Sequence, residues 1–352
     1  MKKAIIAMSG GVDSSVAAYF MKQKGFECIG ATMKLYDNED IGISREKTCC
    51  SLDDIDDARA VARKLEMPYY VFNFKDEFEK KVIDNFVSTY EKGGTPNPCI
   101  DCNRYLKFEK LMQRMKELHY DYVVTGHYAD IEEKDGRYLL KKGADKSKDQ
   151  SYVLYSLTQE QLAHTLFPLG RMSKTEIREI AEREGFVNAK KRDSQDICFV
   201  PDGDYAGFIR TYTGKTYPHG DFVNKSGEVL GTHSGIIKYT IGQRKGLGIA
   251  LGHPVYVCGK NIADNTVTLG TNDDLNCSRL EACDFNWIAP EPDAPITCKA
   301  KTRYNMREVD CIAYCEGDRV VVEFKVPVRA VTSGQAVVLY DGDYVLGGGT
   351  II

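Results

Sequence analysis

The stretch Lys3-Ala4-Ile5-Ile6-Ala7-Met8-Ser9-Gly10-Gly11-Val12-Asp13-Ser14-Ser15 decides the fold of the first half of the chain. Its first six residues form a short apolar run, which is typical of a buried strand. A turn rich in glycine and serine follows, and residues from about 14 to 24 have the pattern of a helix that ends at Gly25. A buried strand joined to a helix by a glycine turn predicts a parallel α/β sheet.

The same alternation continues along the chain. We expect further strands at residues 28–33, 69–74 and 122–126, and further helices at residues 53–65, 107–118 and 173–184. The last of these helices opens with Ser173-Lys174-Thr175-Glu176, which has the form of a capping box. The first part of the chain is therefore predicted to be an α/β domain with a doubly wound parallel sheet.

The pattern changes after about residue 200, where turn pairs multiply and the segments between them are short and β-branched. Residues 255–257 and 266–269 suggest a hairpin, and further strands are expected at 319–326, 336–340 and 344–346. The Pro-rich residues 289–295 are interpreted as an inter-domain turn. We expect three domains: a catalytic α/β domain at 1–200, a central β-rich domain at 201–285 and a C-terminal β-barrel at 286–352.

Composition excludes several classes of protein. The 352 residues are 43% hydrophobic and 28% charged, which is usual for a globular chain and unlike a disordered or fibrous one. No apolar run approaches the ~20 residues of a membrane span, so we expect a cytoplasmic protein with no membrane partner. The net charge of −4 argues against a uniformly basic surface, but residues 171–192 hold seven basic and four acidic side chains.

The turn Ser9–Ser15 has the properties of an anion-binding loop. Glycines let the backbone approach a phosphate, serines donate hydrogen bonds, and the start of a helix favours negative charge. The turn lacks the lysine of G-x-x-x-x-G-K-S/T loops and the spacing of G-x-G-x-x-G, so neither of those motifs applies. The simpler alternative is a tight turn capped by serine.

Three of the twelve cysteines are candidates for chemistry. Cys99 and Cys102 form a C-x-x-C in a Pro-rich loop before the helix expected near Lys107, where neighbouring cations favour a thiolate. Cys198 lies where the α/β pattern ends. A C-x-x-C fits a redox pair, half a zinc site or part of an iron–sulfur site, and no second C-x-x-C completes a zinc ribbon. The adjacent Cys49 and Cys50 are poorly placed to chelate one metal. Structural roles are expected for Cys28, Cys258, Cys277, Cys283, Cys298, Cys311 and Cys315.

The string S-G-G-x-D-S resembles the pyrophosphate loop of enzymes that cleave ATP to AMP and pyrophosphate. Other motifs follow it in the order found in bacterial tRNA-specific 2-thiouridylases, which this chain resembles over nearly its whole length. These motifs are Asn97-Pro98-x-x-x-Cys102-Asn103 and residues 125–129, 148–152, 167–170, 194–199, 239–246, 301–304 and 346–349.

The resemblance implies insertion of sulfur at C2 of the wobble uridine in the tRNAs for lysine, glutamate and glutamine. ATP with Mg²⁺ would adenylate the uridine oxygen, with Asp13 orienting magnesium pyrophosphate. Cys198 matches the family's persulfide cysteine and Cys102 its nucleophile, and a Cys102–Cys198 disulfide would form as sulfur is released. A cysteine desulfurase or a sulfur-relay protein would supply the sulfur.

The resemblance also implies two sets of binding residues. Those for the nucleotide are Ala7, Met8, Ser9, Gly10, Gly11, Val12, Asp13, Ser14, Met33 and Gly126. Those for tRNA are Asn97, Pro98, Cys99, His127, Lys148, Asp149, Gln150, Arg303, Tyr304 and Gln335.

The chain departs from the family at Cys99, where some members carry Asp. This departure leaves open a [4Fe–4S] cluster on Cys99, Cys102 and Cys198 that would serve the same reaction. An argininosuccinate-synthase-like ligase would share the loop but would not need two reactive cysteines. A non-enzymatic RNA-binding module is the remaining alternative, and the intact loop and cysteines argue against it.

Overall fold

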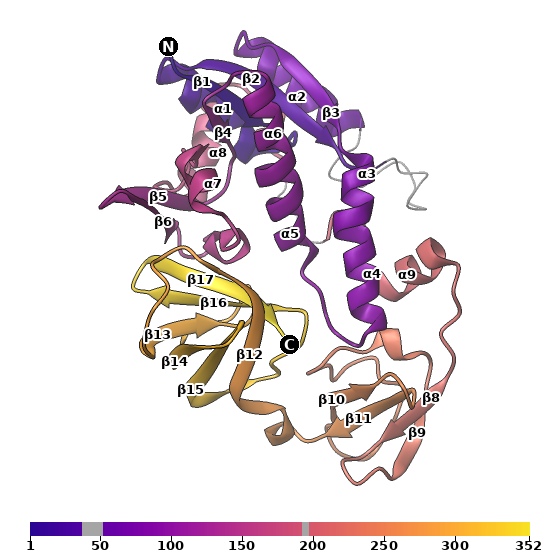
Figure 1. Cartoon of the computed structure of the whole chain (residues 1–352). Helices are drawn as coiled ribbons and strands as arrows, with labels where there is room; N and C mark the ends of the chain where they lie inside the picture. The colour runs from indigo at the N-terminus through magenta and orange to yellow at the C-terminus, as the bar shows by residue number, and fades with distance from the viewer. Residues whose placement is uncertain (37–51, 192–196) are drawn as a thin grey trace. The chain divides into compact units, whose positions relative to one another are not determined.

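The computed structural model describes residues 1–36, 52–191 and 197–352 (Figure 1). Cys49, Cys50 and residues 194–196 of the Cys198 motif lie outside these ranges. None of the helices in the described ranges has the length and apolarity needed to cross a membrane. The chain forms two compact units, and each is described by itself. Unit 1 comprises residues 1–83, 98–203 and 342–346, and unit 2 comprises residues 84–97, 204–341 and 347–352.

Unit 1 is built on a parallel five-stranded sheet. Its strands are β1 (Lys3–Ala7), β2 (Glu27–Lys34), β3 (Tyr69–Asn73), β4 (Tyr122–Val124) and β7 (Thr165–Leu166), in the order β3-β2-β1-β4-β7. Ile5 of β1 pairs with Ile29 on one side and with Val123 on the other. The prediction of a doubly wound parallel sheet is confirmed.

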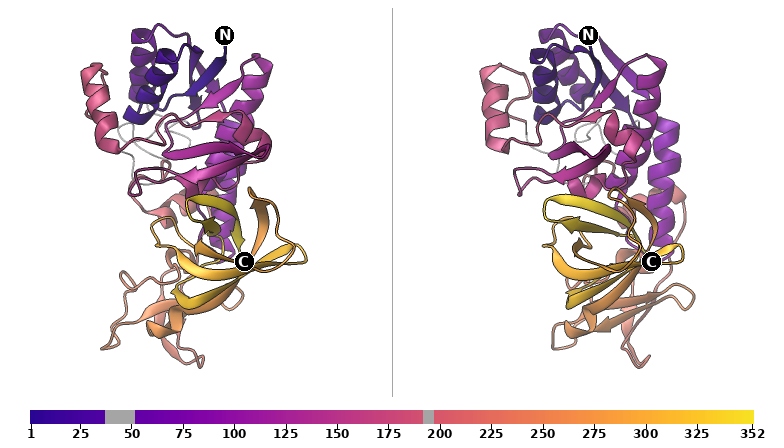
Figure 2. Two further views of the ribbon diagram at one scale, coloured as in Figure 1. Left: turned by 90° about the vertical axis from the view of Figure 1, so that its left-hand side faces the viewer. Right: turned by 60° about the vertical axis from the view of Figure 1, so that its left-hand side comes forward.

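Helices cover both faces of this sheet. Ala4, Ile6 and Met8 alternate onto one face, where they join a core with side chains of α1 (Val12–Gln23), α2 (Leu52–Lys64) and α8 (Lys174–Arg183). Figure 2 shows α1 and α8 on one side of the sheet and α6 (Leu111–Glu117) on the other. The capping box expected at the start of α8 is present, with Ser173 and Glu176 each accepting a backbone N–H of the other.

The segment with the C-x-x-C motif differs from its prediction. Helical structure begins at Pro98 with α5 (Pro98–Asp101) and continues through the π-helical segment η2 (Cys102–Lys110) into α6. The expected start near Lys107, with the cysteines in a preceding loop, is therefore wrong. Proline is suited to the first position of a helix because the N–H it lacks would have no partner there.

Several elements of unit 1 were not predicted. Asp135 and Gly136 both have positive φ and make the tight turn between β5 (Ala129–Lys134) and β6 (Arg137–Lys142), as a two-residue hairpin requires. The other elements not predicted are β7, α3 (Lys75–Phe78), the π-helical η1 (Glu79–Ile83), the 3₁₀ helix η3 (Ser151–Leu154) and α7 (Gln159–Ala163).

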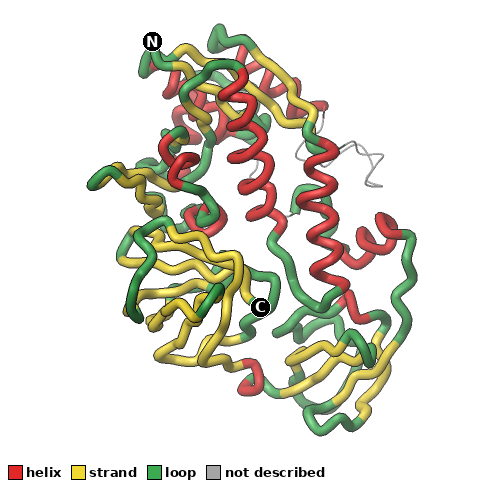
Figure 3. Tube along the Cα trace, viewed as in Figure 1, coloured by secondary structure: helices red, strands yellow, loops and turns green. Residues whose placement is uncertain are grey.

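Unit 2 consists mainly of strands (Figure 3). Its helices are α4 (Asp84–Glu91), α9 (Tyr205–Thr213), η4 (Ile236–Lys238) and η5 (Asp273–Leu275). One sheet has the order β10-β11-β8-β9 and contains β8 (Gly220–Val223), β9 (Val229–His233), β10 (Tyr256–Asn261) and β11 (Thr266–Gly270). The hairpin expected around residues 255–269 is confirmed as β10 and β11.

The remaining strands close into the expected barrel. They are β12 (Asn276–Trp287), β13 (Ile296–Lys301), β14 (Val309–Glu316), β15 (Arg319–Arg329), β16 (Ala336–Asp341) and β17 (Tyr344–Ile351), in the order β12-β15-β14-β13-β16-β17, with β17 pairing again with β12. The Pro-rich residues 289–295 join β12 to β13 of this barrel, so their interpretation as an inter-domain turn is wrong. Proline and acidic residues suit a connection between strands equally well.

Candidate functional site

The expected phosphate loop lies at the point where the order of strands reverses. The chain moves from β1 to β2 and β3 on one side and returns to β4 on the other, and ligands of such sheets bind at the carboxyl ends of these strands. A Cβ atom on Gly126, which follows β4, would lie 2.8 Å from the backbone nitrogen of Ser14. The fold thus brings Gly126 against the start of α1, and glycine permits this approach.

The loop has a backbone that requires glycine at position 10. Gly10 has φ +70°, and a Cβ atom there would lie 2.3 Å from the carbonyl oxygen of Asp54. Gly11 precedes α1 without a side-chain cap, and its carbonyl accepts hydrogen bonds from the hydroxyls of Ser14 and Ser15, each at 3.0 Å. The first amide groups of a helix have no partners within it, so this loop presents donors for an anion.

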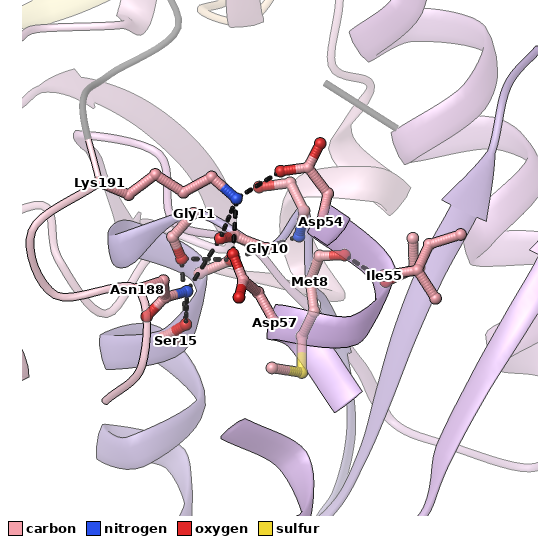
Figure 4. Close-up of polar contacts among 12 residues, drawn as sticks. Met8, Gly10, Gly11, Ser15, Asp54, Ile55, Asp57, Asn188 and Lys191 are labelled. Atoms are coloured by element: carbon pink, nitrogen blue, oxygen red, sulfur yellow. Dashed lines mark hydrogen bonds and ion pairs between the residues drawn. The ribbon is translucent and has the colours of Figure 1, made fainter. Parts of the chain in front are cut away.

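The carbonyl of Gly10 is held by two residues that the sequence did not single out (Figure 4). The amide of Asn188 donates to this oxygen at 2.9 Å, and the ammonium of Lys191 lies 3.4 Å from it. Lys191 also donates to Asp54 at 2.6 Å and to Asp57 at 2.7 Å. Burial acts to lower the pKa of Lys191, but the hydrogen bonds to both carboxylates outweigh it and raise this pKa.

Asp13, expected to orient magnesium pyrophosphate, has two strong partners. The Lys174 ammonium donates to its two oxygens at 2.7 and 2.8 Å, and the hydroxyl of Tyr128 donates at 2.7 Å. Lys174 is the first residue of α8, which brings a cation to the start of α1. Neither contact has a local signal in the sequence, because the partners are 161 and 115 residues away from Asp13.

The other expected nucleotide residues lie on the same edge of the sheet. Ala7 ends β1, and Val12 is the buried first residue of α1. The carbonyl of Met8 accepts from the hydroxyl of Thr32 at 2.6 Å, which joins β1 to β2. Met33 is half-buried near the end of β2, and Ser9 is exposed.

Cys102 is the half-buried first residue of η2 and is followed by the buried Asn103. The amide of Asn103 donates to the carbonyl of Val153 in η3 at 3.1 Å. This bond joins the cysteine-bearing segment to η3, the helix that directly follows the expected tRNA residues Asp149 and Gln150. Cys99, one helical turn earlier, is exposed, and Pro98 is buried.

The side chains of Asp149 and Gln150 also accept hydrogen bonds from backbone amides of unit 1. The Asp149 carboxylate accepts from the backbone of Gly143 at 3.0 Å and from the backbone and hydroxyl of Ser151. The Gln150 side chain accepts from the backbone of Tyr128 at 2.9 Å. Lys148 is half-buried in the same turn.

His127 is a buried residue with contacts at both ring nitrogens. Its Nδ1 lies 2.6 Å from the hydroxyl of Thr125, and its Nε2 lies 3.5 Å from the ammonium of Lys107. Burial, together with the charge of Lys107, lowers the pKa of His127 well below its ordinary value. The ring is therefore neutral at pH 7, and because an ammonium can only donate, Nε2 faces Lys107 with its lone pair.

Cys198 is held near the carboxyl end of β2. The hydroxyl of Tyr36, two residues beyond β2, donates to the carbonyl of Cys198 at 2.9 Å. Phe199 is fully buried and packs edge-on against Phe78, with ring centroids 5.7 Å apart.

The iron–sulfur alternative requires three thiolates that converge. Cys99, Cys102 and Cys198 all lie in the described ranges, yet no group of three Cys, His, Asp or Glu side chains in those ranges could hold a metal ion. The arrangement of these thiols does not fit a cluster.

The four remaining tRNA candidates belong to unit 2. Gln335 donates to the carbonyls of Thr95 at 2.8 Å and Pro96 at 3.2 Å, just before the half-buried Asn97. Arg303, between β13 and β14, donates to the carbonyl of Ala330 and to the hydroxyl of Thr332. Tyr304, the next residue, is half-buried.

Family models match nearly the whole chain. A model described as "tRNA methyl transferase HUP domain" matches residues 2–202. A "tRNA methyl transferase PRC-barrel domain" matches residues 206–271, and an "Aminomethyltransferase beta-barrel domain" matches residues 277–351.

The chain is identical to several curated relatives at about half of the aligned positions. The chain is 52% identical to the tRNA-specific 2-thiouridylase MnmA of Lachnoclostridium phytofermentans, with 100% of both chains covered. It is 50% identical to the protein of the same name from Clostridium perfringens (strain 13 / Type A), over 99% of this chain and 98% of that one. It is 49% identical to that of Clostridioides difficile, with the same coverage.

Proposed function

Because this chain belongs to the family of tRNA-specific 2-thiouridylases, we propose that it replaces the C2 oxygen of the wobble uridine of tRNA with sulfur in an ATP-dependent reaction. The expected tRNAs are those for lysine, glutamate and glutamine. The expected division into three domains, 1–200, 201–285 and 286–352, is kept as part of this proposal, with the last limit moved to before β12 because this strand is part of the barrel.

The first step makes the uridine oxygen a leaving group. The amide groups of the loop around Gly10 and Gly11 and of the first turn of α1 bind the phosphates of ATP. Uridine O2 attacks the α-phosphorus, a new P–O bond forms, and pyrophosphate leaves. The Mg²⁺ that accompanies ATP is part of the substrate and neutralises phosphate charge. Asp13 is the carboxylate placed to meet it, and the Lys174 ammonium orients this carboxylate by donating to both of its oxygens.

The second step transfers sulfur. A cysteine desulfurase or relay protein leaves a persulfide on Cys198, and its terminal sulfur attacks C2 of the adenylated uridine. The Cys102 thiolate attacks the Cys198 sulfur, the S–S bond of the persulfide breaks, and its electron pair stays on the sulfur bound to C2. AMP then leaves with the former uridine oxygen. The Cys102–Cys198 disulfide that results is reduced by a thiol before the next turnover.

One chain of contacts in unit 1 supports this assignment most directly. Asp13 of the loop is bonded to Tyr128, whose backbone is bonded to Gln150. Three residues later in the chain, Val153 accepts from Asn103, the neighbour of Cys102. The loop and the segment that carries the candidate nucleophile therefore belong to one hydrogen-bonded part of unit 1, which supports their use in one reaction.

The test is incubation of the protein with ATP, Mg²⁺, a persulfide donor and unmodified glutamate tRNA, followed by analysis of nucleosides. We expect 2-thiouridine, and we expect Cys102→Ala and Cys198→Ala to abolish it while tRNA still binds. A methylated nucleoside instead would favour the methyl transfer that the name of the matching family model suggests. Release of pyrophosphate with a free amino acid but not with tRNA would favour a ligase.

A further inference from the structure

The phosphate loop is shaped by side chains from a distant part of the sequence. Asn188 and Lys191 follow α8 and lie 178 and 181 residues beyond Gly10 in the chain, and they meet at its carbonyl oxygen. Figure 4 shows both side chains directed at the loop, with Asp54 and Asp57 on different sides of the Lys191 ammonium. None of these four residues belongs to a motif that the family resemblance supplied.

The orientation of the Asn188 amide follows from its partners. Ser15 uses its only hydroxyl proton on the carbonyl of Gly11, at 3.0 Å, so it can only accept from Asn188. The nitrogen of Asn188 therefore faces Ser15 and Gly10, each at 2.9 Å. Asn188 is 3% exposed, so this donor is sheltered from water.

Fixing these carbonyls also fixes the amides that bind the anion. In a trans peptide the C=O and the N–H point in opposite directions. When the Gly10 carbonyl is directed at Asn188 and Lys191, the N–H of Gly11 is directed away from them. The Gly11 carbonyl, held by Ser14 and Ser15, directs the N–H of Val12 in the same manner.

Lys191 adds a second constraint through α2. Its ammonium joins the carboxylates of Asp54 and Asp57, and the backbone of Asp54 is in contact with Gly10. Loss of this cation would remove the charge that Lys191 supplies to both carboxylates, and Asp54 has a side chain only 10% exposed. The first turn of α2 would then be free to shift against Gly10.

We propose that Asn188 and Lys191 are positioning residues that hold the Gly10–Gly11 turn in the conformation that binds the phosphates of ATP. The proposal rests on the proposed function for the identity of the nucleotide. It predicts that loss of either side chain weakens binding of the phosphates and leaves binding of the nucleoside part unchanged.

The experiment measures equilibrium binding of ATP and of adenosine to the full chain by calorimetry. The main variant is Lys191→Met, with Lys190→Met as its matched control because Lys190 is the adjacent, exposed lysine. We expect the Kd for ATP to rise about tenfold in Lys191→Met and to change less than about twofold in Lys190→Met. The Kd for adenosine should stay the same in both, and Lys191→Arg should restore most of the affinity for ATP.

Two results would overturn the proposal: an unchanged Kd for ATP in Lys191→Met, or an equal loss of affinity for ATP and adenosine. The second would mean that the variant damages the whole site rather than the loop. If Lys191→Met does not fold, Asp57→Asn and Asn188→Ser provide the same comparison. Binding is measured without tRNA, so absence of thiolation would count against the proposed function and not against this role.

Discussion

Replacing Gly10 by alanine tests whether Gly10 has the positive φ and the close approach to Asp54 described above. An alanine at φ +70° costs about 1–2 kcal/mol, since a Cβ atom is disfavoured in this region. Its Cβ would also lie 2.3 Å from the carbonyl oxygen and 2.8 Å from the Cα of Asp54, both backbone atoms that cannot rotate away. Such overpacking costs typically about 1–3 kcal/mol more.

Gly25, after α1, is the matched control. It has φ +77°, but an added Cβ there would meet no atom within 4 Å. Gly25→Ala should therefore show the conformational cost alone, and Gly10→Ala that cost and the clash together. The effect of alanine on the unfolded chain is common to both variants.

The assay is urea unfolding followed by far-UV circular dichroism, with slopes compared to confirm that the same surface unfolds. We expect Gly10→Ala to lower the free energy of unfolding by about 1–3 kcal/mol more than Gly25→Ala. We also expect ATP binding to be lost in Gly10→Ala and kept in Gly25→Ala. Equal destabilisation by the two variants would refute the close contact between Gly10 and Asp54.

Three further predictions concern charged and polar partners of the site. Lys174→Met removes the cation from Asp13 and should lower the rate of ATP-dependent pyrophosphate release about 100-fold, measured with saturating tRNA. Arg171→Met, which changes an exposed cation paired with Asp130, should leave this rate unchanged. Burial and the charge of Lys107 lower the pKa of His127 below 6.5, so the unfolded state binds more protons in acid and stability should fall as the pH drops below about 6.5. The thermal stability of His127→Gln should lack this part of the pH dependence. Equal pH profiles of thermal stability in the variant and the unchanged protein would contradict the prediction. Gln335→Ala frees the carbonyls of Thr95 and Pro96, so the KM for tRNA should rise about fivefold while the KM for ATP stays constant. An unchanged KM for tRNA would count against this role.

Local patterns were sufficient to predict four of the five strands in the sheet of unit 1, all except the two-residue edge strand β7. The apolar run at Lys3–Met8 became β1, and the capping box at Ser173 marked the start of α8. In these cases the information lies within a few neighbouring residues: hydrophobic periodicity and reciprocal side-chain caps. The position of the loop followed in the same way, because strand, glycine turn and helix are adjacent in the sequence. The helix start at Pro98 was missed for a local reason, because proline suits both a loop and the first position of a helix.

Features that depend on distant residues were not predictable in this way. Lys174, Asn188 and Lys191 carry no local signal for their roles, since their partners lie more than 130 residues away. A single sequence does not show which of its many lysines will meet Asp13 or Asp54, because the fold decides this.

These distant partners also indicate where the affinity for phosphate originates. Among the described residues around the loop, the ammonium groups of Lys174 and Lys191 are bonded to the carboxylates of Asp13, Asp54 and Asp57. Three carboxylates and two cations leave this group with a net negative charge, which by itself would repel ATP. The oriented backbone amides of the loop and of the start of α1 carry partial positive charges that do not depend on side chains, so they can attract phosphate despite this balance. A loop of glycine and serine exposes such amides, and in our proposal Lys191 contributes by holding the loop in place.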